Sequence, residues 1–247
     1  MNVCLPHNTR AWLASLALAP LLFGTSASHA ALTVNGTRVV YDSAKRSVSM
    51  IVNNPSQVPY AVQSWVNTVT DDTQTPVPFV VHPPLFRLEP GASQQVQISG
   101  LPNELPRDRE SLFYFNVQEI PKASDGENTL TIALRTRIKL FYRPAELNND
   151  PVKAYPTLTW RLDNSRQPAE LEVYNPTPYH VSFLRIDIEN NAHSQHLNSP
   201  AMVEPFARQR YALPGYRPGG KPQVRFRAIN DYGGYTPVGP LAVTLTP

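Results

Sequence analysis

The stretch TLTIALRTRIKLFYRP, residues 129–144, alternates apolar and polar side chains over most of its length. Its even positions are apolar, apart from one threonine, and its odd positions include the cations Arg135, Arg137 and Lys139. Such alternation is typical of a β-strand with one buried and one exposed face. The run is about twice the usual strand length of roughly 5–6 residues. It therefore predicts one unusually long strand with a cationic stripe opposite its apolar face.

Shorter runs with the same alternation lie on both sides of this stretch. The runs before it are LTVNGTRVVYD (32–42), SVSMIVNN (47–54), VPYAVQSWVNTV (58–69), FVVHPPLFRLEPG (79–91), SQQVQISGL (93–101) and SLFYFNVQEI (111–120). Six further runs, from LTWRLD (158–163) to LAVTLTP (241–247), follow the polar, proline-bounded segment 144–156, and no segment of ten or more residues has helical spacing. The pattern predicts an all-β protein of two β-sandwich domains, which we assign to residues 31–148 and 149–247.

The first thirty residues have the pattern of a secretory signal peptide. Residues 11–23 form a mostly apolar run, and the small side chains of Ser28 and Ala30 follow it. This pattern predicts export with cleavage after Ala30, so we assign residues 1–30 to a cleaved signal peptide. A transmembrane anchor would need about 17–25 apolar residues, and this run is shorter and contains Pro20.

Composition excludes several classes of protein. Cys4 is the only cysteine and precedes the apolar run, which disfavours a lipoprotein and leaves the exported part without disulfides. Proline supplies 26 of the 247 residues, about twice its average share of roughly 5%, and this favours short strands that end in turns. The formal net charge is only +3, so charge implies neither nucleic acid nor an acidic membrane surface as a partner. No other segment approaches the length of a membrane span, so we predict no direct insertion into a membrane.

The sequence contains none of the common catalytic motifs. It has no G-x-S-x-G nucleophile elbow, no H-E-x-x-H zinc motif and no glycine-rich phosphate loop. His193 and His196 form H-x-x-H in a polar run, but a metal site needs further ligands and a rigid support, so a solvated loop is the better interpretation. We therefore predict no enzyme, no cofactor and no metal, and we disfavour a secreted hydrolase.

The cations of the opening stretch allow two interpretations. Arg135, Arg137, Lys139 and Arg143 share one face of the predicted strand, and Arg38 lies in the first predicted strand. They can form a solvated face that discourages edge-to-edge pairing. They can also form an anion site, in which Arg and Lys bind a carboxylate through charge-assisted hydrogen bonds. The pattern alone leaves both interpretations open.

Six blocks in order along the exported chain carry a family pattern. They are GTRVVYD (36–42), RLEPG (87–91), PRDRESLFYFNVQEIP (106–121), TRIKLFYRP (136–144), NPTPYHV (175–181) and INDYGG (229–234). They resemble the periplasmic chaperones of the chaperone–usher pilus pathway, the PapD-like family. The resemblance implies two immunoglobulin-like domains arranged at an angle, with a cleft between them that binds pilus subunits. The short loop 121–128, which lacks cysteine, is similar to that of the short-loop branch of the family.

The resemblance also implies roles for individual residues. Arg38 and Lys139 would bind the C-terminal carboxylate of a pilus subunit. Leu130, Ile132 and Leu134 would be donor residues that fill the groove of a pilin, which lacks its last strand. Because Leu130 and Lys139 have opposite parity along the strand, they serve different surfaces or a bulge intervenes.

A second group of implied residues concerns architecture. Glu110, Arg143 and Asp231 would form a buried ion network that sets the interdomain angle. Pro83 matches the position of a cis-proline in the family.

The function implied by the resemblance is binding rather than catalysis. A periplasmic chaperone would fold and cap pilins and adhesin subunits by donor-strand complementation, and would deliver them to the outer-membrane usher. Its backbone would cover the open sheet edge of the subunit, which is otherwise an aggregation hazard. Self-association of the unliganded chaperone stays open. The alternative is a two-domain β-sandwich surface adhesin or carbohydrate-binding module, whose binding surface could include the aromatics of DYGGY (231–235).

Overall fold

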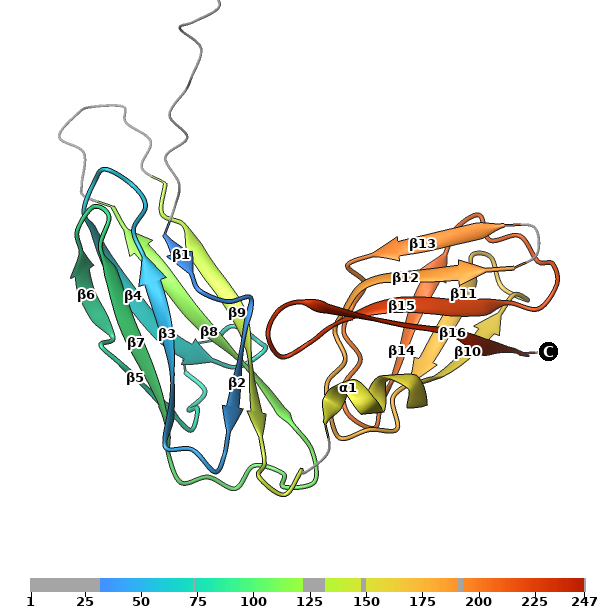
Figure 1. Cartoon of the computed structure of the whole chain (residues 1–247), viewed down its shortest axis with the longest axis horizontal. Helices are drawn as coiled ribbons and strands as arrows, with labels where there is room; N and C mark the ends of the chain where they lie inside the picture. Colours follow the sequence, from blue (N-terminus) through green and yellow to red (C-terminus); the bar gives the residue numbers. More distant parts are fainter. Residues whose placement is uncertain (1–31, 73, 122–131, 148–149, 191–192, 247) are drawn as a thin grey trace, which may run out of the picture. The chain divides into compact units, whose positions relative to one another are not determined.

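The structure is a computed structural model that describes residues 32–72, 74–121, 132–147, 150–190 and 193–246. The chain forms one β-sandwich from strands β1–β9 and a second from strands β10–β16 (Figure 1). This confirms the prediction of an all-β protein with two β-sandwich domains. The predicted signal peptide lies outside the described residues. Among the described residues, no helix has the length and apolar character needed to cross a membrane.

The first sandwich consists of two sheets. One has the strand order β1-β3-β7-β5 and the other the order β2-β9-β8-β4-β6, and all neighbours are antiparallel except β2 and β9. The strands are β1 (Thr33–Val34), β2 (Arg38–Asp42), β3 (Ser47–Asn53), β4 (Tyr60–Asn67), β5 (Phe79–His82), β6 (Leu85–Leu88), β7 (Ser93–Gly100), β8 (Ser111–Ile120) and β9 (Arg135–Arg143). Alternate residues of each strand fill the core between the sheets, as in Phe113, Phe115 and Val117 of β8. The His82–Pro83 peptide bond between β5 and β6 is cis, as the resemblance implied.

The second sandwich is one continuous ladder in the order β13-β12-β15-β16-β10-β11-β14. Its elements are α1 (Pro151–Ala154), η2 (Tyr155–Thr157), β10 (Thr159–Asp163), β11 (Ala169–Tyr174), β12 (Phe183–Glu189), β13 (Ser194–Asn198), β14 (Arg208–Leu213), β15 (Gln223–Ile229) and β16 (Tyr235–Thr246). β16 joins the two faces, because it pairs first with β15 and then, from Val243, with β10. Gly239 lies at the register shift within the β15–β16 pairing, where its φ of 106° and the nearby Val224 carbonyl leave no room for a side chain.

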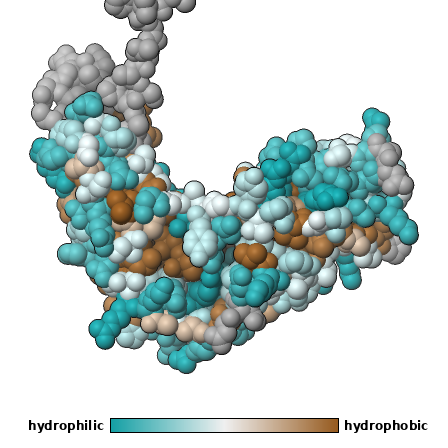
Figure 2. Space-filling model, in the orientation of Figure 1, coloured by the Kyte–Doolittle hydropathy of each residue, from teal (hydrophilic) through white to brown (hydrophobic). Residues whose placement is uncertain are grey.

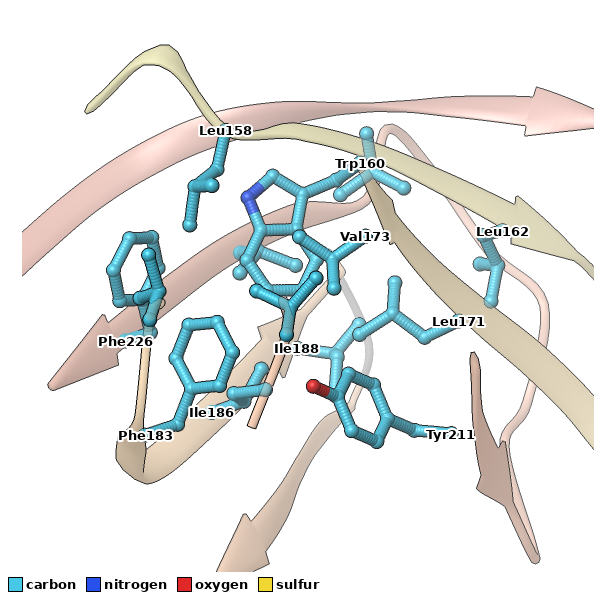
Figure 3. Packing of buried hydrophobic residues seen from close by; sticks show 14 of the residues in the cluster. Leu158, Trp160, Leu162, Leu171, Val173, Phe183, Ile186, Ile188, Tyr211 and Phe226 are labelled. Atoms are coloured by element: carbon cyan, nitrogen blue, oxygen red, sulfur yellow. The ribbon is translucent and has the colours of Figure 1, made fainter. Parts of the chain in front are cut away.

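Aromatic packing fills the core of the second sandwich. Trp160 is almost fully buried, and its ring centroid lies 5.6 Å from that of Phe226 and 6.0 Å from that of Phe183. Phe183 and Phe226 meet edge to face at 5.3 Å (Figure 3). Since residues 31–247 contain no cysteine, packing of this kind replaces the covalent link that a disulfide would supply.

Each sandwich has its own buried polar corner, and the two corners are built in the same way. In the second sandwich the Asn175 side chain donates from Nδ2 to the carbonyls of Tyr179 and Glu204, and its Oδ1 accepts from the amide and the hydroxyl of Thr177. In the first sandwich Asn54 makes the corresponding bonds with Ser56, Val58 and Leu88. Both corners have the sequence Asn-Pro-Ser/Thr and follow a core strand. In each sandwich, therefore, one asparagine forms hydrogen bonds with the backbone groups where the chain leaves the sheet.

Substitution of Asn175 by alanine should destabilise the protein. The change leaves two buried carbonyls without their donor, at a cost of roughly 1–3 kcal/mol for each unsatisfied group. Urea unfolding monitored by tryptophan fluorescence measures the free energy of unfolding. Asn103→Ala, in an exposed turn, is the matched control and should unfold like the parent. Equal midpoints for the two variants would contradict the role of the corner.

Candidate functional site

The parallel register of β2 and β9 sets Arg38 opposite Lys139. The residues next to them, Val39 and Leu140, are buried in the core of the first sandwich. Because side chains alternate along a strand, Arg38 and Lys139 lie on the outer face of the sheet. The structure thus brings together the two cations that the resemblance assigned to one site.

Both cations also contact the second sandwich. Arg38 Nη1 donates to the carbonyl oxygen of Ile229 at 2.9 Å, and its guanidinium carbon lies 5.6 Å from the centroid of the Phe141 ring. Lys139 Nζ donates to Ser182 Oγ at 3.3 Å. These partners are uncharged, so the hydrogen bonds hold the two side chains without neutralising them.

The electrostatics of this pair suit an anion. Within the described parts of the chain, neither Arg38 nor Lys139 takes part in an ion pair, and Arg38 Nε is buried without a hydrogen-bond partner. Burial lowers the pKa of Lys139, and the neighbouring charge of Arg38 lowers it further. Burial also lowers the pKa of Arg38, against the opposing influence of Tyr155 and Asp231. A carboxylate placed between the two cations would favour the charged form of both side chains and would accept charge-assisted hydrogen bonds from them.

Arg143, at the end of β9, has the opposite environment. Its Nε donates to Glu110 Oε1 at 2.8 Å, and its two terminal nitrogens donate to the Asp231 carboxylate at 2.6 and 2.9 Å. Burial opposes the charge of the guanidinium, but Asp231 and Glu110 outweigh it and raise the pKa of Arg143. The structure thus brings together Glu110, Arg143 and Asp231, the residues that the resemblance placed in one ion network.

His180 is a further member of this network, and the sequence did not reveal it. The other oxygen of Glu110, Oε2, accepts from the backbone amide of His180 at 2.8 Å and lies 3.2 Å from its ring Nδ1. The Glu110 side chain is only 2% exposed and that of His180 only 5% exposed. His180 lies in the block NPTPYHV, but no single-sequence signal connects it to Glu110, which is 70 positions away.

Removal of Arg143 should damage the fold. Arg143→Ala leaves two carboxylates facing each other with no cation, and breaking a buried pair in this way costs about 3–5 kcal/mol. Thermal unfolding of the purified protein measures the loss. Arg107→Ala is the control, because Arg107 is 83% exposed and lies 3.9 Å from Glu146, so its unfolding temperature should match that of the parent. A network assignment would be untenable if Arg143→Ala unfolded at the temperature of the control.

The predicted long strand is shorter in the structure. β9 begins at Arg135 rather than residue 129, and residues 132–134 precede it without strand assignment. Ile132 is 63% exposed and Leu134 is 49% exposed. Figure 2 shows that apolar residues also gather elsewhere on the visible face of the first sandwich. Leu130 lies outside the described residues.

The first half of β9 is an open sheet edge. Among the described strands, β8 pairs with β9 from Arg135 onward, whereas β2 pairs with it only from Lys139. The amide of Glu119 donates to the carbonyl of Leu134, the residue opposite it. Hydrogen-bonded and non-bonded pairs alternate in an antiparallel ladder, so the backbone groups of Arg135 and Arg137 point away from β8, toward the open edge.

The register of β9 also answers the parity question. β8 and β9 pair without a shift from Gln118–Arg135 to Ser111–Tyr142. A bulge therefore does not separate Leu134 from Lys139. Leu134 continues the apolar face of β9 and Lys139 belongs to the outer face, so the two residues serve different surfaces.

Arg135 and Arg137 are partly exposed, but they are paired with neighbouring groups rather than solvated on every side. Arg135 Nη1 donates to Asp71 Oδ2 at 3.1 Å, and its guanidinium carbon lies 4.8 Å from the centroid of the Trp65 ring. Arg137 lies over the Tyr114 ring at 3.6 Å. A turn between β4 and β5 thus supplies a carboxylate partner for two cations that remain partly exposed.

His193 and His196 form no recognisable metal site. His193 precedes β13, and His196 lies within this strand, opposite Asp187 of β12. No group of three or more His, Cys, Asp or Glu side chains in the described ranges could hold a metal ion.

Comparison with known proteins places both sandwiches in one family. Residues 31–148 match the family described as "Pili and flagellar-assembly chaperone, PapD N-terminal domain", and residues 153–238 match "Pili assembly chaperone PapD, C-terminal domain". The chaperone protein FimB/FhaD of Bordetella pertussis is 37% identical over 240 residues, which cover 92% of this chain and 95% of that protein.

Solved structures show the same fold. The crystal structure of the YadV chaperone matches with a TM-score of 0.73 at 37% identity, over 84% of this chain and 97% of that chain. A Salmonella enterica structure of the SafA pilin in complex with the SafB chaperone matches with a TM-score of 0.70 at 28% identity, over 84% of this chain and 94% of that chain.

Proposed function

The chain belongs to the PapD-like family of pilus-assembly chaperones, and from this premise we propose that it captures pilus subunits by lending them β9. One observation carries the proposal: an open sheet edge with exposed apolar residues leads directly to a pair of cations that has no counter-ion in the described chain. The edge supplies backbone pairing, the apolar residues supply contact area, and the cations supply an anchor.

The backbone groups at the open edge suit the addition of a strand. The N–H and C=O groups of Arg135 and Arg137 face outward, and a pilin without its last strand has matching groups unpaired. Ile132 and Leu134 alternate on one face of the same segment, where they can enter the groove of the subunit. Leu130 continues this spacing in the sequence, and we propose that it serves as the third donor residue.

The cation pair fixes where the pairing ends. A subunit carboxylate bound by Arg38 and Lys139 would lie at the point where β2 replaces the subunit as the neighbour of β9. A strand that ends there and pairs along residues 132–138 must run parallel to β9, over about 23 Å. Because a slip of one residue would turn the donor side chains away from the groove, the anchor also protects the register.

The remaining assignments follow the family. We propose that residues 1–30 direct export and are removed, that residues 31–148 carry the donor strand, and that residues 149–247 form the second domain. In the periplasm the chaperone would hold pilins and adhesin subunits until the outer-membrane usher receives them. No bond is made or broken in this function, so we propose no catalytic residue.

The adhesin alternative is not favoured. The relatives of this chain are chaperones. Within the segment DYGGY, Asp231 is bound by Arg143, whereas Tyr232 and Tyr235 are exposed, so it is the relatives, and not the burial of these aromatics, that disfavour the alternative.

Subunit capture should depend on the two cations. Arg38→Ala and Lys139→Ala should each abolish recovery of a pilin subunit co-expressed in the periplasm, because the carboxylate loses a charged partner in a half-buried site. Affinity purification of the chaperone followed by mass spectrometry measures the bound subunit. Lys221→Ala, at an exposed position, is the control and should retain the subunit. A stable complex with both Arg38→Ala and Lys139→Ala would overturn the anchor.

A further inference from the structure

Asp71 connects a surface turn to the open half of β9. Its carboxylate accepts two hydrogen bonds from the guanidinium of Arg135, one of them at 3.1 Å, and forms an ion pair with Arg137 Nε at 3.6 Å. Asn67 Nδ2 donates to the same carboxylate at 2.6 Å from the end of β4. We call these contacts of Asp71 with Arg135 and Arg137 the Asp71 brace.

Each arginine of the brace also lies over an aromatic ring. The guanidinium carbon of Arg135 lies 4.8 Å from the centroid of the Trp65 ring, and that of Arg137 lies 3.6 Å from the centroid of the Tyr114 ring. Arg135 Nε also donates to Asn116 Oδ1 at 3.0 Å, and Asn116 is fully buried. Each arginine is therefore held between an aromatic face and a carboxylate, which restricts side chains that are otherwise flexible.

A second contact joins the turn to Arg137. Arg137 Nη2 donates to the carbonyl oxygens of Thr68 at 2.9 Å and of Val69 at 3.3 Å. The turn is fixed in its own right, because Asp72 Oδ2 accepts from the hydroxyls of Thr68 and Thr70. The brace thus connects β9 to a turn that already has a defined shape.

The braced residues are the ones that matter for strand addition. The outward backbone groups at the open edge belong to Arg135 and Arg137, by the alternation of the β8–β9 ladder. Their side chains, and not those of the intervening Thr136, are the ones bound by Asp71. The structure therefore fixes, through side chains, the two residues whose backbone would meet an incoming strand.

We propose that Asp71 is a positioning residue for subunit capture, which holds the open edge of β9 in a preformed strand before the subunit arrives. The inference rests on the proposed function, because it explains how that edge stays ready for pairing. An edge strand with a neighbour on only one side frays more easily than a central strand. If the edge of β9 is already a strand, its backbone does not have to be ordered when the subunit binds. Such ordering otherwise slows association.

Asp71→Asn is the variant that isolates the brace. Asp71 has a φ of 62°, in the left-handed region, and asparagine tolerates this conformation as well as aspartate does. The substitution removes the charge that binds both arginines and leaves the backbone of the turn in place. Glu89→Gln is the matched control, because it removes an exposed ion pair with Arg87 in the same sandwich, away from β9.

The first measurement uses the free protein. Amide hydrogen exchange followed by NMR should be faster at Thr136 and Ile138 in Asp71→Asn than in the parent, and unchanged at Leu140, which β2 covers. The second measurement is the association rate with a pilin subunit diluted out of urea. It should fall by about two- to fivefold in Asp71→Asn, the size expected for loss of one partly exposed bidentate pair, and stay unchanged in Glu89→Gln.

The outcomes separate the brace from the proposed function. Unchanged exchange at Thr136 and Ile138 in Asp71→Asn would overturn the brace. Faster exchange with an unchanged association rate would overturn its role in capture. Failure of the parent protein to bind the subunit would overturn the proposed function, whereas the exchange measurement on the free protein would still decide whether Asp71 orders the edge.

Discussion

The parallel pairing of β2 with β9 determines what the rest of this protein can do. It covers only Lys139–Arg143, opposite Arg38–Asp42, because β2 is five residues long. The pairing places two cations side by side at its first position and leaves the preceding half of β9 with β8 as its one neighbour among the described strands. A longer β2 would close the edge, and an antiparallel β2 would separate Arg38 from Lys139. The candidate site thus follows from the length and direction of one short strand.

Charge along β9 is handled in three ways. Arg143 is matched by two carboxylates, whereas Lys139 faces another cation, Arg38, and is the residue that we propose binds an external anion. Arg135 and Arg137 are bound by a single carboxylate on a turn, which stiffens the edge without closing it. In the proposed function, neighbouring positions on one strand face therefore serve architecture, binding and positioning, because each meets a different element.

The alternation of side chains was enough to predict two β-sandwiches, because burial of one strand face is a local pattern with period two. It also placed Ile132 and Leu134 on one face. The partners of Arg135 and Arg137 could not be predicted, because Asp71 lies 64 positions from Arg135 and its turn folds over the sheet only in three dimensions. The limit of the β2–β9 pairing at Lys139 could not be predicted either, since it depends on the length of β2 rather than on the sequence of β9.

Strand addition at the open edge is the central claim, and residue-resolved amide exchange in the presence and absence of a pilin subunit tests it most directly. In the free protein Thr136 and Ile138 should be protected by β8, while Arg135 and Arg137 exchange rapidly. On binding, Arg135 and Arg137 should gain protection as their amides pair with the subunit. A tight complex in which the amides of Arg135 and Arg137 still exchange as in the free protein would contradict the account.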